Sequence, residues 1–127
     1  MKRMTLIVLF AVITSICLAE EAQPDSTEVK PEITFLELGS TTCVPCKMME
    51  SVLESVREKY GDQIEVIFHD VKKEKEMVAR YQIRMIPTQV FLDAEGKEIH
   101  RHIGFYPEAQ IDEFLQKQGL GIIHSKE

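Results

Sequence analysis

Apolar residues in this chain recur with two periods, one typical of strands and one typical of helices. Short apolar or alternating runs occupy residues 33–38, 64–68 and 88–92, and each predicts a strand. Between the first two runs, apolar residues recur in steps of three and four, at Met49, Val52, Leu53, Val56 and Tyr60. This spacing predicts an amphipathic helix that ends at Gly61, and therefore a strand, a helix and a parallel strand in succession.

A short helix is predicted after the second parallel strand. Its apolar residues lie three to four positions apart, at Met77, Val78 and Tyr81, and we expect it on the other side of the sheet from the first helix. The charged run before it, residues 72–76, is typical of a solvated helix face.

A hairpin and a last helix follow. Residues 93–96, Asp-Ala-Glu-Gly, predict a turn between the strand at 88–92 and an antiparallel return over 97–103. Pro107 suits the first turn of the last helix, which ends before Gly119. These elements predict an α/β fold with a central mixed sheet of four strands and helices on both faces.

Residues 1–19 have the layout of a secretory signal peptide. Lys2 and Arg3 precede an apolar run over residues 6–16, and Cys17-Leu18-Ala19 is typical of a small-residue cleavage site. We expect cleavage near Ala19 and Glu20, and export of the mature chain.

Two kinds of membrane attachment are weaker interpretations of the same segment. The apolar run covers about 11 residues, whereas a helix needs roughly 20 to cross a bilayer. A lipid on Cys17 would follow Ile16, which is bulkier than the small residue usual before a lipid-bearing cysteine.

The remaining 108 or so of the 127 residues support one domain with a modest core. Residues 20–32 are acidic, contain two prolines and predict a flexible leader, or at most a short edge strand that would make the sheet five-stranded. The domain itself is expected over residues 33–119, with a C-terminal tail over 120–127.

The mature chain is acidic. Removal of Lys2 and Arg3 takes Lys plus Arg from 15 to 13 against 21 Asp and Glu, a net charge of −8. Nucleic acid is therefore not expected as a partner, because its phosphates are bound by clustered Lys and Arg.

The candidate chemistry lies in Cys43-Val44-Pro45-Cys46. Two thiols at this spacing can pass a pair of electrons between a disulfide and a dithiol, although the same spacing forms half of many zinc sites. Zinc would need two more ligands, and the candidates, His100 and His102, are expected to be exposed side chains of a hairpin strand. We therefore expect no metal and no cofactor.

The two cysteines are expected to differ in role. At the start of a helix, unpaired N–H groups and the helix dipole stabilise a thiolate, so Cys43 is the expected nucleophile. Pro45 is tolerated in a first turn, and Cys46, one turn deeper, is the expected resolving thiol. Cys43 attacks a substrate disulfide, and Cys46 then attacks the mixed disulfide to release the reduced substrate.

The C-V-P-C motif after a strand, Ile86-Pro87-Thr88, and Gly104 beyond the hairpin together resemble the thioredoxin family over residues 33–118. The resemblance implies a thioredoxin fold in which Pro87 is cis and faces the cysteines. It further implies that the backbone of Ile86 pairs with a substrate peptide.

The same resemblance assigns other site residues. Thr42, Val44 and Pro45 would lie at the substrate-binding surface. Glu37, six residues before Cys43, would be a buried acid that exchanges protons with Cys46, and burial should raise its pKa. The alternative is that Glu37 points to solvent from an edge of the sheet.

Three positions depart from the family pattern. Val44 stands for Gly, Thr42 for the Trp before the first cysteine, and Phe68 for the lysine that often partners the buried acid. The reduction potential therefore cannot be carried over. Val44 is not the His of strongly oxidising relatives, and with Ile86 the motif resembles the reducing branch.

The sequence thus predicts an exported, periplasmic thiol-disulfide oxidoreductase that reduces protein or peptide disulfides as a monomer. Its electrons would come from a membrane thiol carrier, as in periplasmic relatives. Two alternatives stay open: an oxidant or isomerase that uses the same site, and a peptide-binding or chaperone module without turnover. A pure binding module would need neither cysteine, which argues against the second.

Overall fold

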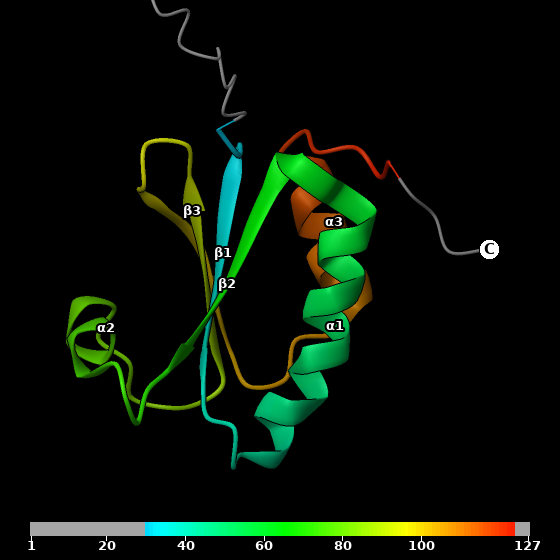
Figure 1. Ribbon diagram of the computed structural model, residues 1–127. Helices are drawn as coiled ribbons and strands as arrows, with labels where there is room; N and C mark the ends of the chain where they lie inside the picture. Colours follow the sequence, from blue (N-terminus) through cyan, green and yellow to red (C-terminus); the bar gives the residue numbers. More distant parts are fainter. Residues whose placement is uncertain (1–29, 124–127) are drawn as a thin grey trace, which may run out of the picture.

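The computed structural model describes residues 30–123, so the predicted signal peptide (1–19), most of the predicted leader and the last four residues of the predicted tail lie outside the described residues. In the described part the sheet has four strands in the order β2-β1-β3-β4. Helices lie on both faces, with α1 and α3 on one side and α2 on the other (Figure 1). The predicted α/β architecture is confirmed.

The strand–helix–strand unit is formed by β1 (Ile33–Gly39), α1 (Val44–Tyr60) and β2 (Ile64–Asp70), with a short 3₁₀ turn, η1 (Gly61–Gln63), before β2. The two strands are parallel along their whole length. Because the carboxyl ends of parallel strands share one edge of a sheet, the loop into α1 and the loop after β2 lie close together.

Helix α1 begins two residues before Cys46. Cys43 is its N-cap, and Pro45 occupies the first turn, where no intrahelical N–H bond is lost. Gly61 ends the helix with φ 53°, and its N–H donates to the carbonyl of Arg57, in the left-handed region that glycine adopts without strain. All five apolar residues predicted for the inner face are buried.

The second half of the domain contains α2 (Lys75–Arg80), β3 (Thr88–Asp93), β4 (Glu98–Ile103) and α3 (Glu108–Lys117). Strand β3 runs antiparallel to both β1 and β4. The return strand begins at Glu98, one residue later than predicted, because Lys97 is tied into the turn by bonds between its backbone and Asp93.

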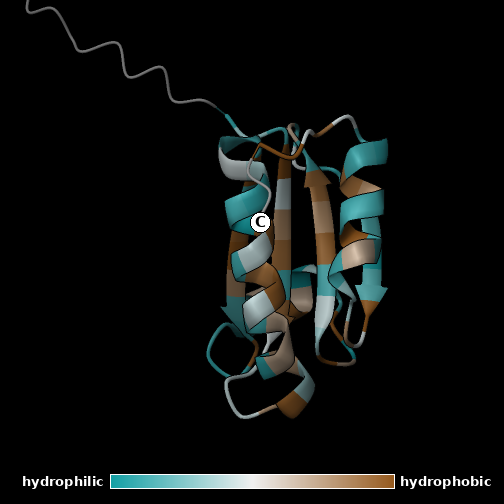
Figure 2. Ribbon diagram, turned by 90° about the vertical axis from the view of Figure 1, so that its right-hand side faces the viewer, coloured by the Kyte–Doolittle hydropathy of each residue, from teal (hydrophilic) through white to brown (hydrophobic). Residues whose placement is uncertain are grey.

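Alternation along the strands divides the core in two. On β1, Ile33 and Phe35 belong to the large cluster beneath α1 and α3, whereas Leu36 and Leu38 belong to the smaller cluster beneath α2. In Figure 2 the central strands are mostly hydrophobic, the edge strand behind α3 is largely hydrophilic, and the helices mix hydrophobic and hydrophilic residues.

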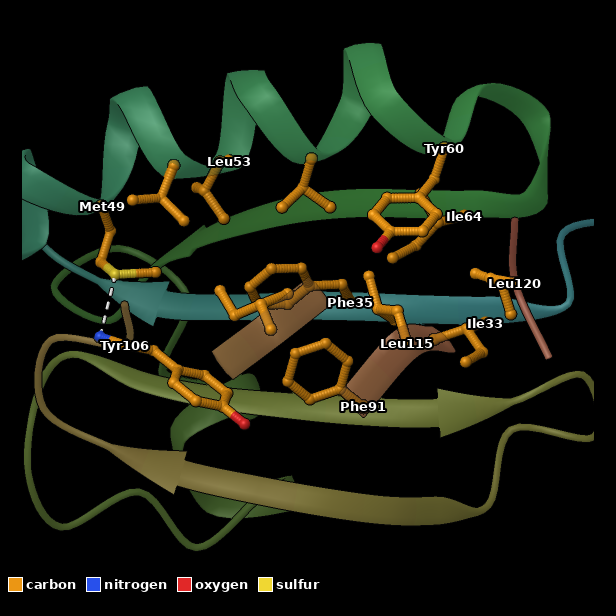
Figure 3. Close-up of a cluster of buried hydrophobic side chains, with 13 residues drawn as sticks. Ile33, Phe35, Met49, Leu53, Tyr60, Ile64, Phe91, Tyr106, Leu115 and Leu120 are labelled. Atoms are coloured by element: carbon orange, nitrogen blue, oxygen red, sulfur yellow. Dashed lines mark hydrogen bonds between the residues drawn. The ribbon is translucent and has the colours of Figure 1, made fainter. Parts of the chain in front are cut away.

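Phe91 lies at the centre of the large cluster (Figure 3). Its ring stacks on Phe35 at a centroid distance of 4.3 Å and meets Phe114 of α3 edge-on at 4.9 Å. Such aromatic pairs add to the free energy gained by area burial alone.

The expectation that His100 and His102 are exposed is wrong. Both are half-buried, because α3 and the segment before it cover the inner face of β4. His100 stacks on Phe114 at 4.5 Å, and its Nε2 lies 3.0 Å from the Tyr106 hydroxyl. Burial lowers the pKa of His100, and the neighbouring His102 lowers it further.

Candidate active site

The two cysteines lie where β1 passes into α1, at the carboxyl edge of β1. They form a disulfide with a Cα–Cα distance of 5.2 Å. The Sγ atom of Cys43 accepts a hydrogen bond from the Cys46 N–H at 3.3 Å, so this sulfur caps the helix. In the dithiol form the same N–H and the helix dipole would stabilise a Cys43 thiolate.

The two cysteines differ in their exposure to solvent. Cys43 is half-buried, whereas only 3% of Cys46 is exposed. A substrate disulfide can therefore reach Cys43. The buried Cys46 can react only with a mixed disulfide that Cys43 has already formed. This arrangement supports the predicted roles of nucleophile and resolving thiol.

Gly39 makes room for Cys46. A Cβ atom at Gly39 would lie 3.2 Å from the Cys46 Sγ and 3.3 Å from the Phe68 ring, both tighter than ordinary contacts. The last residue of β1 can therefore approach the inner sulfur closely. Since side chains alternate along a strand, Glu37, two residues earlier, points to the same side of the sheet as Cys46.

Glu37 is fully buried, so the alternative of a solvent-facing carboxyl is wrong. Its Oε2 atom accepts a hydrogen bond of 2.9 Å from the side-chain Nε2 of Gln89, which pairs with it in register on β3. Burial raises the pKa of Glu37 from its ordinary value of 4.5 to about 7, and the Gln89 hydrogen bond partly counteracts the shift. A carboxyl with this pKa can take up and release a proton near neutrality.

No basic side chain pairs with Glu37 from β2. The register partner there is Phe68, whose ring faces the space above Gly39. Phe68, which stands where the family often has a lysine, therefore lies beside both Glu37 and Gly39, next to the buried acid. Without a cation beside it, the carboxylate relies on a neutral amide.

A lysine does approach the site from the loop after β2. Lys72 Nζ donates to the Thr42 hydroxyl at 2.6 Å, and that hydroxyl lies 3.2 Å from the hydroxyl of Ser40. The Cys43 N–H in turn donates to the Ser40 carbonyl at 3.1 Å. The cation thus reaches the residue next to Cys43, where family members carry a Trp.

The Ile86–Pro87 peptide bond is cis. Thr88 pairs with Leu38, so Pro87, one residue earlier, lies at the same edge of the sheet as the disulfide. Its carbonyl accepts a hydrogen bond of 2.8 Å from the Gly104 N–H. The strand therefore holds Pro87 and the backbone of Ile86 at this edge.

Exposed apolar side chains gather at the same edge. Val44 is 71% exposed and Met85 63%, although both are large hydrophobic residues. Ile103 pairs with Thr88 at the end of β4 and is also exposed. With Thr42 and Pro45, both exposed, these side chains form a surface that suits an extended peptide.

Sequence reasoning missed Gln89 and Lys72. Gln89 is a polar residue in an otherwise apolar strand, a signal that becomes informative once its register with Glu37 is known. Lys72 was interpreted as part of a solvated run, although it follows a strand whose end shares an edge with the disulfide loop.

The described residues contain neither a metal-binding cluster nor a membrane-spanning helix. Among residues 30–123 no group of three or more His, Cys, Asp or Glu side chains could hold a metal ion. Within the same range no helix is long and apolar enough to cross a membrane.

The buried Glu37 makes the stability of the disulfide form depend on pH. A carboxyl whose pKa is raised in the folded state binds its proton more tightly there, so stability is lost as pH rises from about 4.5 to about 7. The loss amounts to about 3 kcal/mol in the free energy of unfolding. Glu37→Gln, which cannot ionise, should remove most of it.

Urea unfolding at pH 4.5 and pH 8 measures this difference. We expect the Glu37→Gln variant to be the more stable protein at pH 8 and nearly equal to the wild type at pH 4.5. Glu50→Gln, at an exposed position of α1, is the matched control and should change neither value by more than about 0.5 kcal/mol. Equal pH dependence in wild type and Glu37→Gln would contradict a raised pKa.

Comparison with known proteins gives the family. The sequence profile of the thioredoxin-like domain matches residues 22–119. Thioredoxin of Bacillus subtilis is 28% identical over 95 residues, which cover 75% of this chain and 90% of that protein. Chloroplastic thioredoxin Y of Oryza sativa is 39% identical over 77 residues, or 61% of this chain and 45% of that protein.

Solved structures agree with these relatives. The germline-specific thioredoxin Deadhead of Drosophila melanogaster superposes with a TM-score of 0.63 and 31% identity, covering 70% of this chain and 83% of that one. A mutant thioredoxin of Halobacterium salinarum has the same TM-score at 22% identity, covering 68% of this chain and 74% of that one. The predicted thioredoxin fold is confirmed, and the chain belongs to the family of thioredoxin-like domains.

Proposed function

We propose that this thiol-disulfide oxidoreductase reduces disulfides of exported proteins or peptides, with Cys43 as nucleophile and Cys46 as resolving thiol. One observation carries the proposal: a disulfide whose outer sulfur caps a helix and whose inner cysteine is only 3% exposed. A structural disulfide needs no such difference between its two sulfurs.

The reaction begins from the dithiol. The Cys43 thiolate attacks one sulfur of the substrate disulfide, and the other substrate sulfur leaves as a thiolate. Cys46 then loses its proton and attacks the Cys43 Sγ, and the second substrate sulfur leaves. Two electrons have passed to the substrate, which takes up two protons, and the protein is left with the Cys43–Cys46 disulfide seen in the structure.

Glu37 is the proposed acceptor of the Cys46 proton. Both side chains lie on the same side of the sheet, and a Cβ at the intervening Gly39 would nearly touch Cys46. A pKa of about 7 keeps about half of the carboxyl ionised at neutral pH. Cys46 lies too deep for bulk water to serve as the acceptor as readily.

The substrate would bind as an extended strand. Its backbone would pair with Ile86 beside Pro87, and its side chains would contact Thr42, Val44 and Pro45. The exposed apolar residues at this edge support a peptide or protein substrate, since a small polar disulfide would leave them in water. A peptide-binding module without turnover would use the same surface.

Export is part of the proposal and rests on residues 1–19, with their basic start, apolar run and small-residue site. In the periplasm of a bacterium, a membrane thiol carrier would return the disulfide to the dithiol, and the protein would act as a monomer.

We expect the mature chain to begin near Glu20, as measured by mass spectrometry of the periplasmic fraction. A chain that keeps residues 1–19 and stays in the cytosolic fraction would refute export.

Single-cysteine variants test the assignment of roles. Cys46→Ser should trap a mixed disulfide between Cys43 and a disulfide-bonded peptide, because no thiol remains to resolve it. Non-reducing electrophoresis and mass spectrometry detect the adduct. Cys43→Ser is the matched control and should form at least tenfold less adduct, since Cys46 is buried. A trapped adduct in Cys43→Ser alone would reverse the roles, and none in either would support a binding module.

The reduction potential decides the direction of the reaction. We expect a value near roughly −270 mV, as in a reductant, because the motif lacks the His of strongly oxidising relatives. Alkylation of free thiols across glutathione buffers, followed by mass spectrometry, gives the value without a Trp reporter, which this chain lacks. A value near about −120 mV would make the protein an oxidant instead.

A further inference from the structure

Gln89 is an unusual residue for its place in the fold. It lies in β3, fully buried, between Thr88 and Val90, which are buried as well. Burial of a primary amide costs free energy unless its polar atoms are hydrogen-bonded. Gln89 makes one such bond, from its Nε2 to the Glu37 carboxyl at 2.9 Å. The presence of an amide at this buried position is therefore explained by its partner and not by packing alone.

Strand register fixes the two side chains side by side. Glu37 and Gln89 are direct partners in the antiparallel β1–β3 pair, and Phe35 and Phe91, the next partners on the same face, stack on each other. On the other side of Glu37, Phe68 offers only a ring. Among the described residues, Gln89 is the side chain that hydrogen-bonds to Glu37.

Two oxygens in this pair have no partner. Glu37 Oε1 and Gln89 Oε1 are both buried and without a hydrogen bond. An ionised carboxyl only accepts hydrogen bonds, so the amide N–H₂ is the group that it needs. A protonated carboxyl carries an O–H donor, and the unpaired amide oxygen is then the acceptor that it needs. A half-turn about the last torsion of Gln89 exchanges the two.

We infer that Gln89 is a positioning residue for Glu37, which holds the buried carboxyl in register and hydrogen-bonds to it in both of its protonation states. This inference rests on the proposed role of Glu37 as the acceptor of the Cys46 proton. An apolar residue at position 89 would serve neither state and would leave the carboxylate buried without a donor.

Titratable groups face the same side of the sheet as Glu37 from several elements. His100 lies opposite Phe91 on β4 and Asp93 opposite Ile33, and Tyr60 of α1 and Tyr106 before α3 are buried in the cluster on this face. Three further groups lie on this side. Cys46 faces it from α1. Asp70, at the end of β2, accepts from the Lys72 N–H at 2.9 Å. His102 follows Gln89 in register on β4, and its Nε2 lies 3.2 Å from the Phe105 carbonyl. Among the described residues, the side-chain hydrogen bond to the Glu37 carboxyl comes from the neutral Gln89 and not from any of these groups.

The test replaces Gln89 by Met, which is similar in size and lacks the amide. The midpoint for Glu37 is read from the ¹³C signal of its carboxyl in the disulfide form. We expect it to move upward by about one pH unit, because the hydrogen bond that Met removes is stronger to the charged carboxylate than to the neutral acid. Rapid mixing of the dithiol protein with a disulfide-bonded peptide measures the rate at which the mixed disulfide is resolved. At pH 7 this rate should fall about fivefold in Gln89→Met, and it should recover above pH 9.

Two further measurements use the wild type and a control. The side-chain ¹⁵N signal of Gln89 in the wild type should shift with the same midpoint as the Glu37 carboxyl. Val90→Ala is the matched control, because Val90 is equally buried on the same strand but belongs to the cluster on the opposite face. It should lower stability and leave both pH profiles unchanged.

The outcomes separate this inference from the proposed function. If Gln89→Met lowers Tm but leaves the Glu37 midpoint where it is, as Val90→Ala does, Gln89 is a packing residue and the inference is wrong. If Glu37→Gln leaves the rate of resolution unchanged at every pH, the role of Glu37 fails, while the midpoint in Gln89→Met still reports on Gln89. Should Gln89→Met not fold, Gln89→Leu also removes the amide donor without adding a charge and must likewise raise the midpoint.

Discussion

The parallel pairing of β1 with β2 determines where chemistry can occur in this domain. Parallel strands require a crossover, and here the crossover is α1, whose first turn starts at the carboxyl end of β1. The same pairing brings the loop after β2, with Lys72, to that edge. Strand β3 adds Pro87 from the other side. The parallel pairing therefore places the disulfide and the Lys72 loop at one edge of the sheet, and the antiparallel pairing of β3 places Pro87 at the same edge.

The site combines a buried acid with neutral neighbours. Glu37 has Phe68 on one side and an amide on the other, and its burial lowers the stability of the ionised protein by about 3 kcal/mol. The apolar cluster around Phe91 offsets this cost. The lysine that reaches this edge bonds to Thr42, next to the nucleophile. The ammonium group thus reaches the residue beside the outer sulfur, whereas the inner sulfur lies on the same side of the sheet as an acid whose pKa is raised by burial.

Periodicity and the C-x-x-C spacing were enough to predict the strands, the helices and the position of the disulfide. The burial of Glu37 was expected only from the resemblance to thioredoxins, and the sequence left a solvent-facing carboxyl as the alternative. The role of Gln89 could not be predicted in this way, because it depends on which residue of β1 lies opposite Gln89. The local sequence does not encode the register between strands that are distant in the chain. The burial of His100 was missed for a related reason. Helix α3 covers its face of β4, and the sequence of residues 97–103 does not indicate which helix packs there.

The two ends of the described chain lie together, far from the disulfide. Lys30 and Ile123 line one cavity beside Tyr60, and the Ile123 N–H donates to the Lys59 carbonyl at 2.8 Å. Both ends therefore sit at the last turn of α1, whereas Cys43 caps its first turn (Figure 1). The 17 residues of the helix span about 25 Å. A tether attached at either end, to a fusion partner or a solid support, would consequently leave the reactive sulfur pointing away from the point of attachment.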